Sequence, residues 1–298
     1  MSPAATSGVE RIAEAFARAR ANGRRAALMP YLMGGYPDLA TSREIGLAYA
    51  RSGADLVELG VPFSDPLADG PVIHAAATAA LSAGATLPAV LEIGRAIAAE
   101  VPVVLMCYFN VILARGVERC LDEVAGIGAS GVIVPDLPLE ESDRTRAACT
   151  EAGLALIPLV APTTPEGRLA RIGAAAQGFL YTVALTGTTG ERPGGSHAGG
   201  GLEAIVARAA AHSDVPIAVG FGIGTPAQAA AAAAAGADGV IVGSRLVRAA
   251  GAAEHPVDEV SELVAQFAAA LSDGHRPEHD APAALDDVRA PGRDAPAA

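Results

Sequence analysis

The chain has 298 residues, of which 51% are hydrophobic and 18% charged, which is enough apolar material for a large core and excludes global disorder. Its 33 acidic and 21 basic residues give a net charge of -12, which disfavours nucleic acid and anionic membranes as partners unless the basic groups cluster. The sequence contains no uncharged apolar run of about 18 residues, so a membrane-spanning helix is excluded.

All basic residues are arginine, and this limits the chemistry that the chain can perform. Without lysine it can form neither an internal Schiff base nor a G-x-x-x-x-G-K-[ST] phosphate loop. Its three cysteines, Cys107, Cys120 and Cys149, are odd in number and widely spaced, so they predict neither a disulfide framework nor a zinc site. A reducing, cytoplasmic location is expected.

The first predicted element is an amphipathic helix near the start of the chain. Ser7 followed by Glu10 is a capping-box pattern, and Ile12 and Phe16 lie on one face of the helix that it opens. The segment lacks the apolar stretch of a secretory signal. Its arginines are also a feature of transit peptides, an alternative that the acidic Glu10 and Glu14 disfavour.

Eight short apolar runs follow along the chain, and each has the composition of a strand. They begin at Ala26, Asp55, Pro102, Gly131, Ala155, Gly178, Pro216 and Gly239. Ala-rich segments with helical periodicity separate them, at 41–51, 71–81, 86–100, 117–126, 140–152, 165–176, 202–212 and 226–235. The mean interval between runs is about 30 residues, the length of a βα unit.

The strand-like runs are continuously apolar, which indicates burial on both faces and therefore a parallel sheet. Eight βα units predict an α/β fold of the (β/α)8 TIM-barrel type, with the N-terminal helix as an addition. The alternative is a doubly wound open sheet, which usually has fewer strands. We expect one barrel domain over residues 1–271 and a disordered acidic tail, rich in Pro and Ala, over 272–298.

The loop after the second strand carries the most unusual carboxylates. Glu58 lies within a buried strand, where the pKa of a carboxyl rises and suits a general acid or base. Asp65 and Asp69 follow in a proline-rich loop. The alternative readings are an ion pair of Glu58 with an arginine, and helix-capping or turn roles for the two aspartates.

Glycine clusters follow the sixth, seventh and eighth strands. Glycines and helix N-termini present backbone N–H groups to anions, and phosphate sites after strands seven and eight recur in barrels. We therefore predict a phosphate site at Gly190, Gly222, Gly243 and Ser244, with plain turn glycines as the alternative. Gly222 and Gly224 also fit a loose dinucleotide pattern, but no acidic strand end follows about 20 residues later.

No metal site is predicted, because the six histidines are scattered and only His74 lies near the acidic loop. Nucleophilic Cys or Ser triads have no supporting spacing either. The residues therefore point to carboxylate acid–base chemistry on a phosphorylated substrate.

The segment from Glu58 to Pro71, ELGVPFSDPLADGP, closely resembles the signature of the tryptophan synthase alpha chain family. The resemblance extends over about residues 11–271. It implies a retro-aldol lyase of L-tryptophan biosynthesis, which cleaves indole-3-glycerol phosphate to indole and glyceraldehyde 3-phosphate. It also implies a beta-chain partner in an alpha2beta2 heterotetramer. The cofactor, pyridoxal phosphate, would belong to the beta chain, and this chain would hold none.

The resemblance also assigns roles to individual residues. Glu58 matches the catalytic glutamate that protonates indole C3, and Asp69 matches the carboxylate that holds the indole N–H. The implied substrate-binding residues are Tyr31, Ile133, Leu159, Tyr181 and Thr189. The implied phosphate-binding residues are Gly190, Gly222, Gly243 and Ser244. The residues implied to face the beta chain are Asp65, Asn110 and Pro138.

Two segments depart from the family pattern. The sequence 183–185 is Val-Ala-Leu where the family commonly has serine and often arginine, and 190–201 is longer and richer in glycine. Extra glycines increase the entropy lost on ordering, which predicts a lid that closes weakly without the partner. The alternative functions are a stand-alone indole-releasing lyase and a catalytically silent phosphate-binding barrel. The presence of both Glu58 and Asp69 disfavours the silent barrel.

Overall fold

The computed structural model describes residues 6–183, 201–220 and 222–272. Within these residues nine parallel strands form one sheet, in the order β5-β4-β3-β2-β1-β9-β8-β7-β6. The strands are β1 (Ala27–Met33), β2 (Val57–Gly60), β3 (Val103–Met106), β4 (Gly131–Ile133), β5 (Ala155–Ile157), β6 (Leu159–Val160), β7 (Leu180–Val183), β8 (Ile217–Gly220) and β9 (Gly239–Val242).

The predicted eight-stranded barrel is confirmed, because β5 and β6 are two halves of one barrel strand. Only Pro158 separates them, and it has no N–H to donate to a neighbouring strand. β5 pairs with β4, while β6 pairs with β7. β1 pairs with both β2 and β9, which joins the first and last strands of the barrel.

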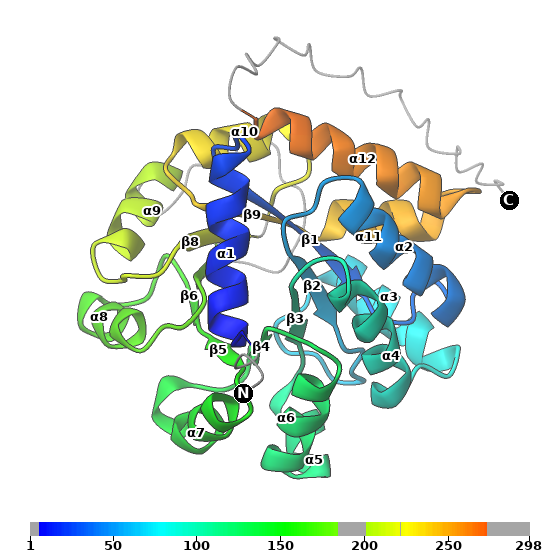
Figure 1. Ribbon diagram of the computed structural model, residues 1–298, viewed down its shortest axis with the longest axis horizontal. Coiled ribbons are helices and arrows are strands. Elements are labelled where there is room, and N and C mark those ends of the chain that lie inside the picture. Colours follow the sequence, from blue (N-terminus) through cyan, green and yellow to red (C-terminus); the bar gives the residue numbers. More distant parts are fainter. Residues whose placement is uncertain (1–5, 184–200, 221, 273–298) are drawn as a thin grey trace, which may run out of the picture.

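The helices surround the sheet, as Figure 1 shows. They are α1 (Gly8–Ala21), α2 (Leu39–Arg51), α3 (Pro71–Ser82), α4 (Leu87–Ala98), α5 (Phe109–Arg115), α6 (Val117–Gly126), α7 (Asp143–Glu151), α8 (Glu166–Ala174), α9 (Leu202–Ala210), α10 (Pro226–Ala234), α11 (Ser244–Ala252) and α12 (Pro256–Ala270), with a 3-10 turn at Leu139–Glu141. The helical segments predicted from the sequence are present, with ends shifted by a few residues. The sequence analysis missed α12, although Val260, Leu263, Val264 and Phe267 have the spacing of a buried helix face.

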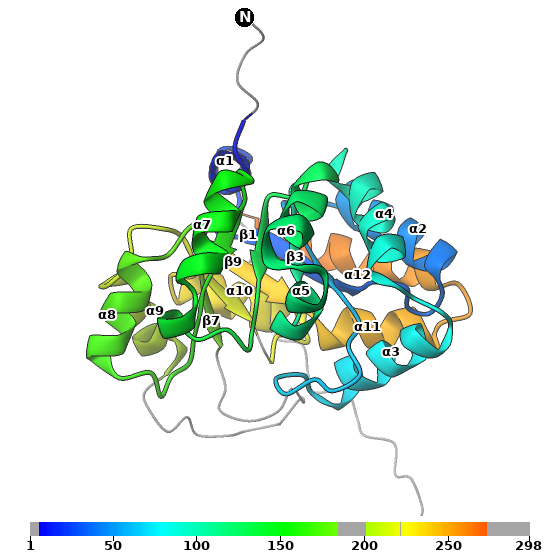
Figure 2. The same ribbon diagram turned by 90° about the horizontal axis from the view of Figure 1, so that it is seen from below.

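The predicted N-terminal helix is confirmed and covers one end of the barrel (Figure 1 and Figure 2). The Ser7–Glu10 capping box is formed as predicted. Ile12 and Phe16 are buried, and the Phe16 ring lies 6.1 Å from that of Phe179. The Arg11 guanidinium donates hydrogen bonds to carbonyl oxygens just before β4, at 2.8 and 2.5 Å. Because α1 occupies the amino-terminal mouth, the carboxyl ends of the strands are the accessible end.

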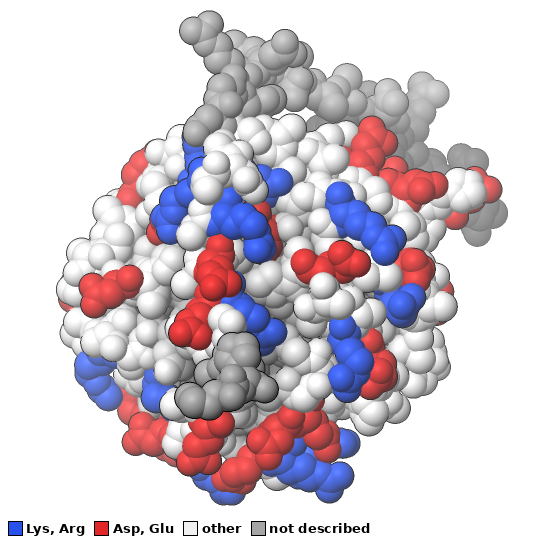
Figure 3. Space-filling view, in the orientation of Figure 1, with Lys and Arg blue, Asp and Glu red and all other residues white. Residues whose placement is uncertain are grey.

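Charged side chains are interspersed on the face that carries α1. Figure 3 shows basic and acidic groups side by side there. Ion pairs such as Arg144–Glu118, at 2.9 Å, and Arg20–Asp238, at 2.9 Å, place opposite charges together. The described residues on this face therefore form no extended positive surface of the kind that binds nucleic acid.

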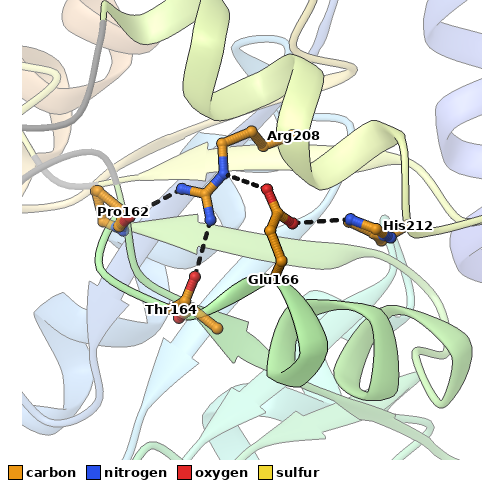
Figure 4. Close-up of polar contacts among 5 residues, drawn as sticks. All are labelled: Pro162, Thr164, Glu166, Arg208 and His212. Carbon is orange, nitrogen blue, oxygen red and sulfur yellow. Dashed lines mark hydrogen bonds and ion pairs between the residues drawn. The ribbon is translucent and has the colours of Figure 1, made fainter.

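Arg208 of α9 fastens the loop between β6 and α8, as Figure 4 shows. Its guanidinium donates to the carbonyl oxygens of Pro162 and Thr164, at 2.9 and 2.8 Å. It also donates to the carboxylate of Glu166 at 3.1 Å, and that carboxylate lies 2.9 Å from His212. One side chain thus fixes a loop at the carboxyl end of the barrel and the first residue of α8.

The described part of the chain ends at Ser272, which still belongs to the folded unit through an isolated bridge to Arg24. The predicted tail therefore lies, beyond Ser272, outside the described residues. No single helix in the described ranges is long and apolar enough to cross a membrane. The helices α3 and α4 reach the length and hydropathy of a membrane span only when they are counted as one segment, and the angle between them is 111°.

Candidate active site

A pocket opens at the carboxyl ends of β1, β2, β7, β8 and β9. The residues that line it are Tyr31, Glu58, Asp69, Ile73, Met106, Tyr181, Gly222, Ile223, Gly224, Ile241, Gly243, Ser244 and Arg245. One part of this lining consists of the carboxylates Glu58 and Asp69 with Tyr31 and Tyr181. Another consists of the glycines that precede α11 together with Ser244, the first residue of that helix. The pocket therefore combines an acidic wall with a wall of backbone groups.

Glu58 is the most unusual side chain in the pocket. It is 1% exposed, and neither carboxylate oxygen has a hydrogen-bond partner among the described residues. Burial, with a smaller contribution from the charge of Asp69, raises the pKa of Glu58 to about 8. The carboxyl is therefore protonated at neutral pH and can donate a proton. Within the described part of the chain, Glu58 forms no ion pair with an arginine, the alternative that the sequence left open.

Asp69 lies at the end of the loop that leads from β2 to α3. Burial raises the pKa of Asp69, while a hydrogen bond from the Tyr108 hydroxyl and the nearby His74 lower it. The N-cap of α3 is Gly70, followed by Pro71, and no side chain caps this helix. The helix-capping role considered for Asp69 is thus not realised, and its carboxylate faces the pocket instead.

Two tyrosines stand beside Glu58, and two glycines make room for them. Tyr31 pairs in register with Glu58, and both Tyr31 and Tyr181 are buried. A Cβ on Gly60 would lie 2.0 Å from the Tyr31 hydroxyl, and a Cβ on Gly220 would lie 2.4 Å from that of Tyr181. Burial is the main cause that raises the pKa of both phenols, and nearby acidic groups add to it, Asp69 before Glu58 at Tyr31 and Glu58 at Tyr181. They remain neutral and can only form hydrogen bonds.

The opposite wall has the features of an anion site. α11 begins at Ser244 after Gly243, and no side chain of a described residue caps its first turn. Gly222 has φ +85°, a conformation that favours glycine, and it also lines the pocket. The uncapped N–H groups and the positive end of the helix dipole favour a bound anion. Arg245 is the single cationic residue among the described lining residues.

The structure brings together most of the residues predicted from the sequence. Those that line the pocket are Tyr31, Glu58, Asp69, Tyr181, Gly222, Gly243 and Ser244. Ile133 lies in the barrel core, fully buried and not in the lining. Leu159 pairs in register with Tyr181 and lines a second hollow next to the ends of β4 and β6. Thr189, Gly190 and the lid segment 184–200 lie outside the described residues.

The three residues predicted to face a partner are all exposed. Asp65 follows β2, Asn110 lies in the first turn of α5 after β3, and Pro138 follows β4. They therefore occupy three adjacent loops at the carboxyl end of the barrel. Leu67, in the same loop as Asp65, is 86% exposed, which is unusual for a leucine and typical of a contact surface.

The lining residues that were not predicted as site residues are Ile73, Met106, Ile223, Gly224, Ile241 and Arg245. Ile73 lies in the first turn of α3, and Arg245 follows the predicted Ser244. Closeness in sequence to a predicted site residue could therefore have identified these two. Met106 and Ile241 appeared only as parts of apolar strands. Among the described residues no group of three or more His, Cys, Asp or Glu could hold a metal ion.

Comparisons with known proteins agree with this geometry. The tryptophan synthase alpha chain family profile matches residues 16–274. A tryptophan synthase alpha chain of Prochlorococcus marinus (strain MIT 9313) is 48% identical over 244 residues, which cover 81% of this chain and 87% of the relative. One from Gloeobacter violaceus is 46% identical over 261 residues, covering 86% and 93%.

A solved structure of Mycobacterium tuberculosis tryptophan synthase superposes with a TM-score of 0.81 at 39% identity, covering 89% of this chain and 99% of that one. The tryptophan synthase subunit alpha from Legionella pneumophila superposes with a TM-score of 0.76 at 35% identity, covering 88% and 98%. The profile match and the level of identity show the family. The chain belongs to the tryptophan synthase alpha chain family, and it is a lyase of tryptophan biosynthesis.

Proposed function

We propose that this chain cleaves indole-3-glycerol phosphate to indole and glyceraldehyde 3-phosphate, with Glu58 as the acid–base catalyst and Asp69 as the stabilising carboxylate. The observation that carries the assignment is the buried Glu58 carboxyl, which has no hydrogen-bond partner among the described residues and lines the same pocket as Asp69 and the start of α11. Burying a carboxyl without a hydrogen-bond partner costs free energy. A substrate that accepts its proton explains why such a group lies in the pocket.

The first step is protonation of indole C3 by Glu58. The ring becomes an indolenine cation, and the carboxyl becomes a carboxylate. Asp69 accepts a hydrogen bond from the indole N–H and stabilises the positive charge that develops there. The partial burial of Asp69 strengthens this attraction.

In the second step the Glu58 carboxylate removes the proton from the glycerol hydroxyl next to the ring. The carbon–carbon bond breaks, and its electron pair returns to the indole ring. The carbon that carried the hydroxyl becomes the aldehyde of glyceraldehyde 3-phosphate. Glu58 has regained its proton, so the cycle closes without a Schiff base, which agrees with the absence of lysine.

We assign the phosphate to the wall formed by Gly222, Gly243 and Ser244, where the uncapped start of α11 supplies N–H donors. Gly190 would complete this site. Tyr31 and Tyr181 would flank the indole ring, with Ile133, Leu159 and Thr189 as the further substrate contacts that the family implies.

We further propose that Asp65, Asn110 and Pro138 contact a beta chain that holds pyridoxal phosphate, in an alpha2beta2 assembly. Their exposure in three neighbouring loops, together with the exposed Leu67, supports this surface. We place the protein in the cytoplasm, because its three cysteines are free thiols, all buried.

The test is indole release from indole-3-glycerol phosphate, measured with and without a beta chain. We expect weak activity alone, a strong increase with the partner, and a loss of about 10²–10⁴-fold in Glu58→Gln. Glu92→Gln, at a side chain that is 69% exposed, is the matched control. Strong activity without the beta chain would favour a stand-alone lyase. Substrate binding without turnover in either condition would refute the proposal and favour a silent barrel.

A further inference from the structure

Tyr108 makes three contacts with the loop that carries Asp69. Its hydroxyl accepts a hydrogen bond from the Ala68 N–H at 3.0 Å and, through its interaction with the neighbouring Asp69 carboxyl, lowers the pKa of that group. Its ring stacks on Phe63, with centroids 5.2 Å apart and planes inclined by 26°. Tyr108 therefore holds the loop both near its beginning, at Phe63, and at its end.

Tyr108 is itself held in place by a hydrogen bond between the residue after it and the loop that follows β4. It is the N-cap residue of α5 and is 3% exposed. The following N–H, that of Phe109, donates a hydrogen bond to Asp136 Oδ1 at 2.8 Å. Asp136 lies in the loop after β4, so hydrogen bonds connect the loops that follow β2, β3 and β4.

We propose that Tyr108 is the positioning residue of the catalytic loop: by holding the Ala68 N–H and the Phe63 ring it keeps the Asp69 carboxylate directed into the pocket, and Asp136 fixes Tyr108 in turn. This inference rests on the proposed function and adds a residue to which the sequence analysis assigned no role. The hydroxyl satisfies the Ala68 N–H and interacts with the neighbouring Asp69 carboxyl. Phenylalanine would keep the ring stack and lose both of these hydroxyl interactions, which separates positioning from packing.

The groups that face Asp69 determine how the ionisation of its carboxyl depends on pH. They are Glu58 from β2, Tyr31 from β1, His74 from α3 and Tyr108 at the start of α5. Burial raises the pKa of Asp69, and the hydroxyl of Tyr108 and the nearby His74 lower it. Without the hydroxyl the pKa of Asp69 rises further. Because the ionised form is the active one, the acidic limb of the pH–rate profile then moves to higher pH.

The experiment compares the full-length wild-type protein and Tyr108→Phe, each with the beta chain added, by steady-state kinetics across the pH range. We expect kcat to fall about 10- to 100-fold, the equivalent of the ~1.5–3 kcal/mol of a hydrogen bond to a charged group. The KM should change little, since the phosphate wall is untouched. The acidic limb should shift to higher pH.

Two further variants complete the design. Tyr36→Phe removes a hydroxyl from a tyrosine outside the pocket lining, and it should keep the wild-type kcat and acidic limb. Asp136→Ala removes the acceptor for the Phe109 N–H, and we expect a smaller loss of kcat with a shift in the same direction. If Tyr108→Phe loses its circular dichroism signal and is therefore unfolded, Asp136→Ala tests the proposal in its place. Its kcat and the position of its acidic limb are then the two quantities compared with the wild-type protein.

The failure of this inference differs from the failure of the proposed function. A wild-type protein that releases indole, combined with an unchanged kcat and acidic limb in Tyr108→Phe, overturns the positioning role alone. A loss of kcat without any shift of the acidic limb also overturns it, because a general structural defect would do the same. A wild-type protein that binds substrate but releases no indole overturns both.

Discussion

Replacing Glu58 by glutamine should change how the stability of the protein depends on pH. Burial raises the pKa of this carboxyl from 4.5 to about 8 in the folded protein. Between these values the folded protein keeps the proton and the unfolded chain loses it. Because the unfolded chain then binds fewer protons, the free energy of unfolding of the wild-type protein falls as pH rises through this window.

The size of the effect follows from the two pKa values. One unit of difference corresponds to about 1.4 kcal/mol, so the wild-type protein should lose roughly 3 kcal/mol of unfolding free energy between pH 5 and pH 8 through Glu58. Glutamine stays neutral, and the variant lacks this loss. Since a domain is typically stable by only about 5–15 kcal/mol, the difference is easily measured.

The assay is urea unfolding followed by circular dichroism at pH 5, 6, 7 and 8. It compares the wild-type protein, Glu58→Gln and the exposed control Glu92→Gln. We expect the control to follow the wild-type protein and the Glu58 variant to gain stability relative to both as pH rises. Parallel curves for the wild-type protein and Glu58→Gln would refute the reasoning, since they would mean that this carboxyl does not hold its proton when folded.

Three other substitutions test neighbouring features. Asp69→Asn removes the charge that stabilises the cation, so kcat should fall by ~10²-fold or more, and a change in KM alone would contradict that role. Gly220→Ala places a Cβ 2.4 Å from the Tyr181 hydroxyl, which should cost about 1–3 kcal/mol in urea unfolding and raise KM, whereas Gly126→Ala meets nothing within 4 Å and serves as control. Arg208→Ala removes two hydrogen bonds to loop carbonyls, so the free energy of unfolding should fall by about 1–3 kcal/mol. An unchanged midpoint of urea unfolding would show that these hydrogen bonds do not stabilise the loop.

The sequence predicted the fold because its signal is local and repeated. Each strand is a short run of buried apolar residues, and β2 and β9 are buried at every position. Such runs, separated by helices that reach the next strand, leave few topologies besides a barrel. The Ser7–Glu10 capping box is also a local pattern, and it is formed as predicted; the structure shows a second one at Thr225, which the sequence analysis did not identify.

Side-chain positions across strands were harder to predict, because they depend on register and on breaks in the sheet. Pro158 divides the fifth strand, and Leu159 consequently lines a second hollow, while Ile133 is covered within the core. Met106 and Ile241 line the pocket, although nothing in their strands distinguishes them from other apolar residues.

The sequence by itself determined the barrel, the location of the site at the strand ends and the two carboxylates, because strand periodicity and a charge within an apolar strand can be read locally. Only the tertiary structure decided that Glu58 has no hydrogen-bond partner among the described residues, that Asp69 does not cap α3, and that Tyr108 connects the loop of Asp69 to α5. The pairing and burial of a charge depend on neighbours that are distant in sequence. Those neighbours are fixed only when the barrel closes and brings the loops after β2, β3 and β4 together.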